Sequence, residues 1–264
     1  MKHFFKLPKK NKKEITKADD FYIIGKDTKF NTLESYKVAR TNIMYSLPKS
    51  DSGKVILVTS SEPGEGKTTA TINLAITFAQ TGAKTLIIDC DMRKPRVHRY
   101  LKVERANGIS NVLCGFKHLD EVILKNPSPI TDNLDVIPAG EIPPNPAELL
   151  SSDEMQSVLN ELSKQYDYIF IDTPPVTVVT DAMVVAPKTT GILCVVKQDV
   201  STYDNYDAAI GILKNANVKI LGFIFNCSEK GSSKYQYYSK RYKYSGRYNY
   251  TYKYLGEYRD NHDD

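Results

Sequence analysis

KVILVTSSEPGEGKTT, residues Lys54–Thr69, decides the fold, because it leads from a β-branched apolar run through a glycine loop into a helix-like stretch. A phosphate-binding loop needs this setting, in which backbone N–H groups of the loop and of the helix start point at phosphate oxygens. Ser61 replaces the first glycine of the usual pattern, but the Gly-x-Gly-Lys-Thr core is intact. We predict that Lys67 binds the β- and γ-phosphates of ATP and that the Thr68 hydroxyl binds Mg²⁺. The residues predicted to hold the nucleotide are Gly64, Glu65, Gly66, Lys67, Thr68 and Thr69.

Two further apolar runs end in acidic residues. LIIDCDMR carries Asp89 and Asp91, and YIFID ends at Asp172. Side chains at the carboxyl ends of parallel strands converge on one crevice, so we expect these carboxylates beside the phosphate loop. Together with Lys67 they form the predicted catalytic set, in which Asp91 and Asp172 join Thr68 as Mg²⁺ ligands and Asp89 is the general base. The structural alternative for Asp89 or Asp91 is an aspartate that only caps the following turn.

Apolar runs and helix-like stretches alternate along the chain, which predicts an α/β domain with a doubly wound, mostly parallel sheet. The expected strands are Val55–Thr59, Thr85–Asp89, Leu134–Pro138, Tyr168–Asp172, Gly191–Val196 and Lys219–Asn226. The expected helices are Leu33–Tyr45, Thr68–Gln80, His118–Lys125, Ala147–Gln165 and Tyr203–Asn215.

Composition divides the chain into a basic N-terminal arm (1–30), a phosphate-loop domain (31–230) and a tyrosine-rich tail (231–264). The net charge of +5 is uneven: residues 1–17 contribute +6 and residues 234–264 contribute +3, which leaves −4 for the remainder. A tail almost without aliphatic residues cannot form a core, so we expect it to be disordered. Its ten tyrosines, the predicted phosphorylation sites, are Tyr235, Tyr237, Tyr238, Tyr242, Tyr244, Tyr248, Tyr250, Tyr252, Tyr254 and Tyr258.

The four cysteines show no metal-type spacing, which favours buried free thiols in a reducing compartment. The start of the chain has no apolar stretch of signal-peptide length, and no segment approaches the length needed to span a bilayer. These features predict a cytoplasmic protein whose contact with a membrane comes from a partner or from the basic arm. An acidic body between basic ends does not favour nucleic acid as a partner.

Several motifs together resemble the bacterial tyrosine kinases of capsule and exopolysaccharide loci, of the cytoplasmic CpsD/CapB type. Besides the three nucleotide motifs they are ESYKVARTN from Glu34, DMRKPRVH from Asp91, PAGEIPPNPAELL from Pro138 and the terminal tyrosine cluster. The resemblance implies an autophosphorylating tyrosine kinase that uses ATP and Mg²⁺ and regulates the synthesis, chain length and export of a polysaccharide. It assigns nucleotide binding and catalysis to Lys67, Thr68, Asp89, Asp91 and Asp172.

The resemblance also implies a separate membrane-spanning activator, a cognate phosphotyrosine phosphatase and a homo-oligomer, with a ring as one form. The family's self-association helix has the pattern Glu-x-x-Arg-x-x-Arg, whereas this chain has Glu34, Lys37 and Arg40. Lys37 cannot reproduce the planar fork of an arginine, and ion pairs within one helix are the alternative for these residues. Asn226, at the end of the last expected strand, resembles the adenine-contacting Asn of related ATPases, and a turn Asn is the alternative.

Two other functions fit parts of the sequence. A ParA/MinD-type partitioning or positioning ATPase of the deviant Walker group shares all three nucleotide motifs, but Glu62 stands where its signature lysine would be. Such an ATPase has no need for ten tail tyrosines. A non-enzymatic binding module is the second alternative, because tyrosines between basic residues can stack on single-stranded nucleic acid.

Overall fold

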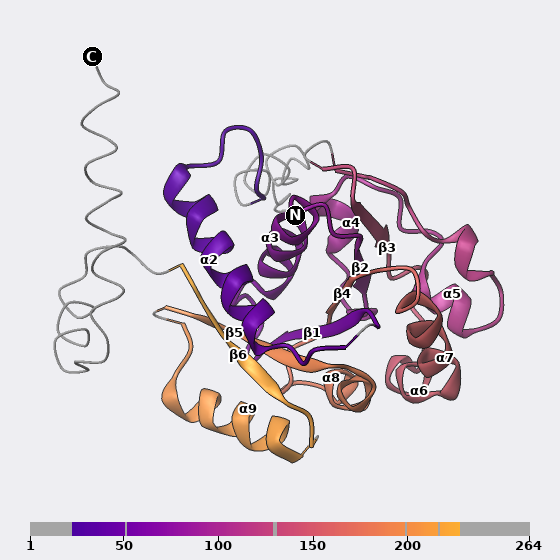
Figure 1. Ribbon diagram of the computed structural model, residues 1–264. Coiled ribbons are helices and arrows are strands. Elements are labelled where there is room, and N and C mark those ends of the chain that lie inside the picture. Colours follow the sequence, from indigo (N-terminus) through magenta and orange to yellow (C-terminus); the bar gives the residue numbers. More distant parts are fainter. Residues whose placement is uncertain (1–22, 51, 129–130, 199, 216, 228–264) are drawn as a thin grey trace, which may run out of the picture. The chain divides into compact units, whose positions relative to one another are not determined.

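The computed structural model describes residues 23–50, 52–128, 131–198, 200–215 and 217–227. They form one six-stranded sheet in the order β3-β2-β4-β1-β5-β6, and all neighbouring strands pair in parallel (Figure 1). The predicted α/β class and parallel sheet are confirmed. The strands are β1 Lys54–Ser60, β2 Thr85–Asp89, β3 Leu134–Ile137, β4 Tyr168–Asp172, β5 Gly191–Lys197 and β6 Ile220–Asn226. The tail tyrosines and residues 1–22 of the basic arm lie outside the described residues.

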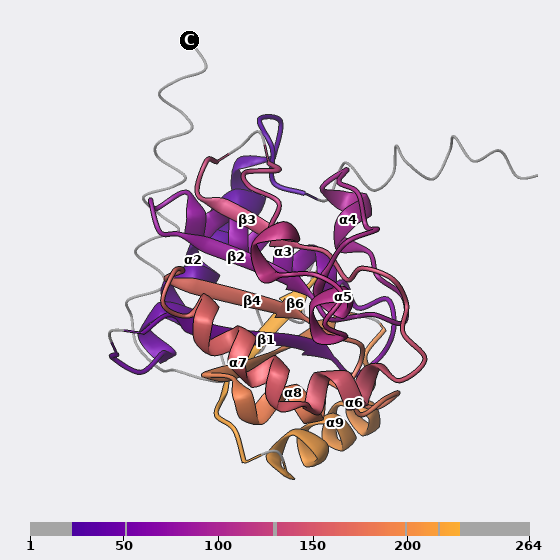
Figure 2. The same cartoon turned by 90° about the vertical axis from the view of Figure 1, so that its right-hand side faces the viewer.

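Helices cover both faces of the sheet, which explains why the central strands are apolar throughout (Figure 2). On one face lie α2 Phe30–Ser46, α3 Lys67–Ala79 and α4 Val97–Tyr100. On the other face lie α5 Ile109–Leu113, the 3₁₀ turn η2 Leu119–Glu121, α6 Pro146–Ser151, α7 Asp153–Leu162, α8 Asp181–Val185, the 3₁₀ turn η3 Ala186–Lys188 and α9 Tyr203–Asn215. No helix among the described residues is long and apolar enough to cross a membrane.

Helix α3, which directly follows the phosphate loop, is almost completely buried between the sheet and α2. The Phe78 ring packs edge-on against Phe170 of β4 with ring centroids 5.2 Å apart. Asn73, also buried, accepts a 2.8 Å hydrogen bond from the backbone N–H of Ile24, which is itself buried. The packed domain therefore includes residues upstream of position 31.

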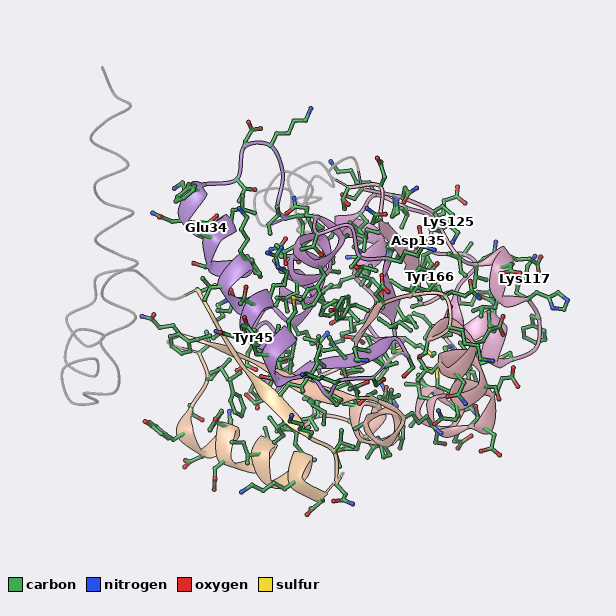
Figure 3. All side chains as sticks on the ribbon, viewed as in Figure 1. Glu34, Tyr45, Lys117, Lys125, Asp135 and Tyr166 are labelled. Carbon is green, nitrogen blue, oxygen red and sulfur yellow. The ribbon has the colours of Figure 1, made fainter. Side chains whose placement is uncertain are left out.

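The prediction of a helix over His118–Lys125 is wrong, because only the 3₁₀ turn η2 forms there. Leu124 instead makes an antiparallel bridge with Val136 of β3. Lys125 pairs with Asp135 at 2.9 Å and also donates to the Tyr166 hydroxyl at 3.0 Å (Figure 3). Pairing with β3 and this polar cluster hold the segment extended.

The helix predicted over Ala147–Gln165 is two helices. The break falls at Ser152, whose backbone is extended and whose hydroxyl accepts the Met155 N–H at 3.3 Å. Ser152 is thus the N-cap of α7, a position that serine favours because its side chain satisfies a free N–H of the first turn.

Candidate active site

The phosphate loop runs from the end of β1 to the start of α3, with Gly66 as the helix N-cap at φ 89°. A Cβ atom at Gly66 would lie 2.1 Å from the side-chain nitrogen of Asn226, so the space and the φ angle both require glycine. The first N–H groups of α3 have no acceptor inside the helix and can bind an anion. The loop therefore has the backbone that its sequence predicts.

Asn226 comes to the loop from the end of β6. Its side-chain nitrogen donates to the backbone oxygen of Glu65 at 2.9 Å, so its amide supports the phosphate loop. Thr69 is half-buried in the first turn of α3. These are the positions of the two remaining residues predicted to contact the nucleotide.

Lys67 and two of the predicted carboxylates form one ionic cluster at the ends of β2 and β4. The Lys67 ammonium lies 2.8 Å from Asp91 Oδ2 and 3.9 Å from Asp172 Oδ1. The Thr68 hydroxyl donates to Asp172 Oδ2 at 2.7 Å. Asp89 and Asp172 are register partners in the adjacent strands β2 and β4. The structure thus brings together all five residues that the sequence singled out.

Asp89 is fully buried in this arrangement, and backbone donors occupy both of its oxygens. Oδ1 accepts the N–H of Asp91 and Oδ2 accepts the N–H of Val97, each at 3.2 Å. The carboxylate therefore shapes the turn after β2, as the structural alternative expected. The side chains of Asp91 and Lys67 are slightly open to solvent, whereas that of Asp172 is closed.

Burial and mutual repulsion set the protonation of the cluster. Burial, followed by the charges of Asp172 and Asp91, raises the pKa of Asp89 well above its usual range. Burial also raises the pKa of Asp172, although the charge of Lys67 and the Thr68 hydrogen bond oppose the shift. Burial alone would lower the pKa of Lys67, but the charges of Asp172 and Asp91 outweigh it, so the ammonium is retained.

The cluster fits a magnesium ion. Thr68, Asp91 and Asp172 offer a hydroxyl and two carboxylates, and Mg²⁺ binds proteins through one or two carboxylates while keeping waters and phosphate oxygens. Among the described residues, no group of three His, Cys, Asp or Glu side chains is arranged to hold a metal by itself. These side chains would therefore supply only part of the coordination of Mg²⁺, and the phosphate oxygens of a bound nucleotide would supply more of it.

Glu65 belongs to the loop, but its side chain points inward, which the sequence did not indicate. The buried carboxylate accepts the Ser61 hydroxyl at 3.0 and 3.1 Å and the Glu62 N–H at 2.9 Å. The hydroxyl of Ser201, from the segment before α9, also donates to it. Lys197 of β5 donates to the Gly64 carbonyl at 3.3 Å. The loop is thereby fixed to β5 and to the approach to α9.

A second feature missed from the sequence is a two-pronged ion pair beside the cluster. Arg93 Nε and Nη2 donate to Asp181 Oδ2 and Oδ1 at 2.9 and 3.0 Å. The Asp181 side chain is fully buried, whereas that of Arg93 is 42% exposed. Because Arg93 lies two residues after Asp91, the pair anchors the turn after β2 to the start of α8.

The predicted self-association residues all lie on α2, on which Figure 3 labels Glu34. Lys37 pairs with Glu34 in the same helix at 2.8 Å. Arg40 instead donates to the Thr77 carbonyl near the end of α3 at 2.6 Å. Arg40 therefore holds α2 against α3 within the chain.

Comparison with known proteins adds to this geometry. Residues 53–203 match the family model described as AAA domain. The chain is 37% identical over 209 residues to the putative tyrosine-protein kinase CapB of Staphylococcus aureus, covering 78% of this chain and 90% of that protein. It is 36% identical over 209 residues to the tyrosine-protein kinase YwqD of Bacillus subtilis, covering 79% and 86%.

Two solved structures are also similar to this chain. The chimerical protein CapA2B2 matches with a TM-score of 0.70 and 33% identity over 83% of this chain and 100% of that one. The septum site-determining protein MinD from Pyrococcus horikoshii, complexed with Mg-ADP, matches with a TM-score of 0.55 and 27% identity over 67% and 72%.

Proposed function

This chain belongs to the bacterial tyrosine kinases of capsule and exopolysaccharide loci, and from that premise we propose that it transfers the γ-phosphoryl group of ATP to tyrosines of its own C-terminal segment. It is a protein-tyrosine kinase involved in the synthesis of such polysaccharides. Regulation of their chain length and export is part of the proposal. The observation that carries it is the joining of Lys67, Thr68, Asp91 and Asp172 in one cluster, in a chain that ends in ten clustered tyrosines.

The reaction needs a bound triphosphate and a deprotonated phenol. Lys67 and the free N–H groups at the start of α3 bind the β- and γ-phosphates. The phenol oxygen attacks the γ-phosphorus, the bond from that phosphorus to the bridging oxygen breaks, and ADP leaves. A phenol has a pKa near 10, so a carboxylate that accepts its proton assists the attack.

We assign that proton to Asp89. Its raised pKa narrows the gap to the phenol, which favours proton transfer. Both oxygens of Asp89 accept backbone N–H groups in the present arrangement. Because Asp89 is also fully buried, the turn after β2 must move before a tyrosine can reach the base.

Thr68, Asp91 and Asp172 are the residues that would hold Mg²⁺, and the Mg-ADP named for the MinD structure supports ATP with Mg²⁺ as the bound form. When bound, Mg²⁺ neutralises charge that develops on the transferring phosphates. Lys67 now pairs with Asp91. If Asp91 bound Mg²⁺ instead, the Lys67 ammonium would be released to contact the phosphates.

A separate activator is the proposed partner, together with a cognate phosphotyrosine phosphatase. The match to the chimerical protein CapA2B2 over the whole length of that chain supports a partnership between this kinase and a CapA-like protein. The proposed location is cytoplasmic, at the membrane through that activator.

Self-association through α2 is proposed as well. Phe30, Val38 and Tyr45 on this helix are exposed. Replacing Glu34 and Lys37 together by alanine should shift the protein to smaller species in sedimentation velocity. Arg40 is a poor test position, because its loss also removes the bond to α3. Unchanged sedimentation of the Glu34→Ala/Lys37→Ala protein would exclude this pair from the interface.

The function is tested by transfer between molecules. A Lys67→Met full-length chain supplies acceptor tyrosines without activity, and an active chain truncated after Lys230 supplies activity without acceptors. With ATP and Mg²⁺ we expect phosphotyrosine on the full-length tail. Absence of label in this mixture, while the intact active chain labels itself, would restrict transfer to a single molecule. Absence of label in every mixture, with the activator segment added, would remove the proposed function.

A further inference from the structure

A run of basic residues follows the turn that carries the catalytic aspartates. The basic segment, Lys94–Arg105, contains Lys94, Arg96, Arg99, Lys102 and Arg105, against a single acid, Glu104. All of them except the half-buried Arg105 are exposed. The part of the chain between its two basic ends has a net negative charge, so the basic segment is a positively charged stretch within an acidic domain.

The backbone of the basic segment touches the catalytic carboxylates directly. The Lys94 N–H donates to Asp91 Oδ1 at 3.0 Å, and the Val97 N–H donates to Asp89 Oδ2 at 3.2 Å. Arg96 directly precedes the single turn α4 and Arg99 lies within it, an i, i+3 spacing that places them on one side of the turn. The basic segment therefore begins at the edge of the site.

Four of these basic side chains form no ion pair with a neighbouring acid among the described residues. Within the described part of the chain, no carboxylate forms an ion pair with Lys94, Arg96, Arg99 or Arg105. Like charges instead gather here: burial, then the charges of Arg99 and Arg105, lower the pKa of His98. An array of guanidinium groups without carboxylate partners is suited to an external anion.

We propose that the basic segment docks phosphotyrosines of the C-terminal tail, the product of the adjacent site, on the same or a second copy of the chain. This inference rests on the proposed function. A guanidinium binds a phosphate through two parallel hydrogen bonds, which makes Arg96 and Arg99 the principal contacts.

Charge complementarity selects the phosphorylated tail over the unmodified one. Residues 234–264 carry seven Lys and Arg against four Asp and Glu, so the unmodified tail is repelled by the basic segment. Each phosphotyrosine adds about −1.5 to −2. Two modifications therefore cancel the +3 charge of the tail, and a third makes it negative.

Spacing links docking to the next transfer. The tail tyrosines follow one another at intervals of one to four residues. An extended chain spans roughly 3.3 Å per residue, so a docked phosphotyrosine holds its nearest unmodified neighbours within about 13 Å. The basic segment is in hydrogen-bond contact with Asp89 and Asp91, so docking retains the tail where the next acceptor is needed. We therefore expect several tyrosines of one tail to be phosphorylated in succession before that tail dissociates.

Binding is measured first, with no need for kinase activity. The probe is a synthetic peptide of residues 235–254, either unmodified or phosphorylated at Tyr242 and Tyr244, and the protein is the full-length Lys67→Met chain. We expect the phosphorylated peptide to bind at least roughly tenfold more tightly than the unmodified one. Arg96→Gln with Arg99→Gln should remove that difference, and higher salt should weaken it.

The matched control is Lys84→Gln with Lys164→Gln. It removes two exposed positive charges that lie at the amino ends of β2 and β4, the opposite edge of the sheet. We expect this control to retain affinity within about twofold. If the Arg96/Arg99 protein is unfolded by circular dichroism, Arg99→Glu alone replaces it, with the same expectation.

The second readout is intact mass spectrometry of the active chain at half consumption of tail sites. If docking holds the tail at the site, chains with several phosphates should be seen beside unmodified chains. In the Arg96/Arg99 variant, the number of phosphates per chain should form a single distribution around its mean. Equal phosphopeptide affinity in wild type and variant, or an equal loss in the control, would overturn the proposal. Binding of vesicles containing phosphatidylserine through these arginines, without phosphopeptide binding, would make the segment a membrane contact and overturn it too. A chain that docks the phosphopeptide but makes no phosphotyrosine would instead remove only the proposed kinase reaction.

Discussion

Replacing Arg93 by alanine tests whether the turn behind Asp91 is held by an ion pair to α8. The pair has one fully buried partner, Asp181, and one partner that is 42% exposed. Removing the arginine leaves a carboxylate without its cation in the interior. Removing the carboxylate leaves a guanidinium that can turn toward water. The two single variants should therefore differ in stability even though they break the same interaction.

Breaking a buried pair by deleting one partner costs about 3–5 kcal/mol, and we expect about 3 kcal/mol for Arg93→Ala because part of the site is open to water. Asp181→Asn should cost about 1–2 kcal/mol, the value of lost hydrogen bonds without a stranded buried charge. The double variant has no unpaired charge and should be more stable than Arg93→Ala alone. Arg93→Lys keeps the charge but loses the fork, so it should fall between wild type and Arg93→Ala.

Urea unfolding of the wild type and the four variants at one pH gives these differences in unfolding free energy, provided that the m-values agree. Phosphotyrosine formation should be measured at a temperature at which every variant is folded, where Arg93→Ala is expected to be slower because Asp91 is no longer anchored. If Arg93→Ala costs less than about 1 kcal/mol, or if the two single effects simply add in the double variant, the pair does not act as a clamp.

Two further substitutions address the site itself. Asp89→Asn should slow transfer by about 10²–10⁴ in single-turnover phosphorylation, the usual contribution of a positioned base, and near-normal turnover by folded protein would withdraw its assignment. Glu65→Gln keeps one acceptor oxygen but turns an NH₂ group toward the donors around it, so we expect a loss of about 1–3 kcal/mol in unfolding free energy. It should raise the KM for ATP more than it lowers kcat, and a change in kcat alone would argue against a role in shaping the phosphate loop.

The sequence predicted the sheet and the central cluster because both depend on local patterns. Each β-branched run is long enough for one buried strand, and parallel strands bring their carboxyl ends to one edge whatever lies between them. Asp89, Asp91 and Asp172 could thus be placed near Lys67 without knowing any loop. Asn226 reached the loop for the same reason, although its amide supports the Glu65 carbonyl.

The remaining features depend on contacts between distant segments. Arg93 and Asp181 are 88 residues apart, and no local pattern links them. The stretch near Lys125 has a helix-like composition, but the strand edge at Val136 and the carboxylate of Asp135 hold it extended. The contact of Ser201 with Glu65 could not be predicted either, because a serine before a helix is expected to cap that helix. Tertiary hydrogen bonding overrides local preference at each of these places.

The charge balance of the cluster links its stability to its chemistry. Three buried carboxylates face one lysine; burial is the main cause of the raised pKa values of Asp89 and Asp172, and repulsion among the carboxylates adds to it. Asp91 and Asp172 would hold a divalent cation, whose charge would offset the excess negative charge and leave Lys67 available to phosphates. That charge would also reduce the repulsion that favours a protonated Asp89, so Asp89 would be more readily ionised and able to accept a phenolic proton. A nucleotide bound with Mg²⁺ would therefore favour the ionised form of Asp89 that a base requires, and the basic segment lies directly beside it, because its backbone donates to both Asp89 and Asp91.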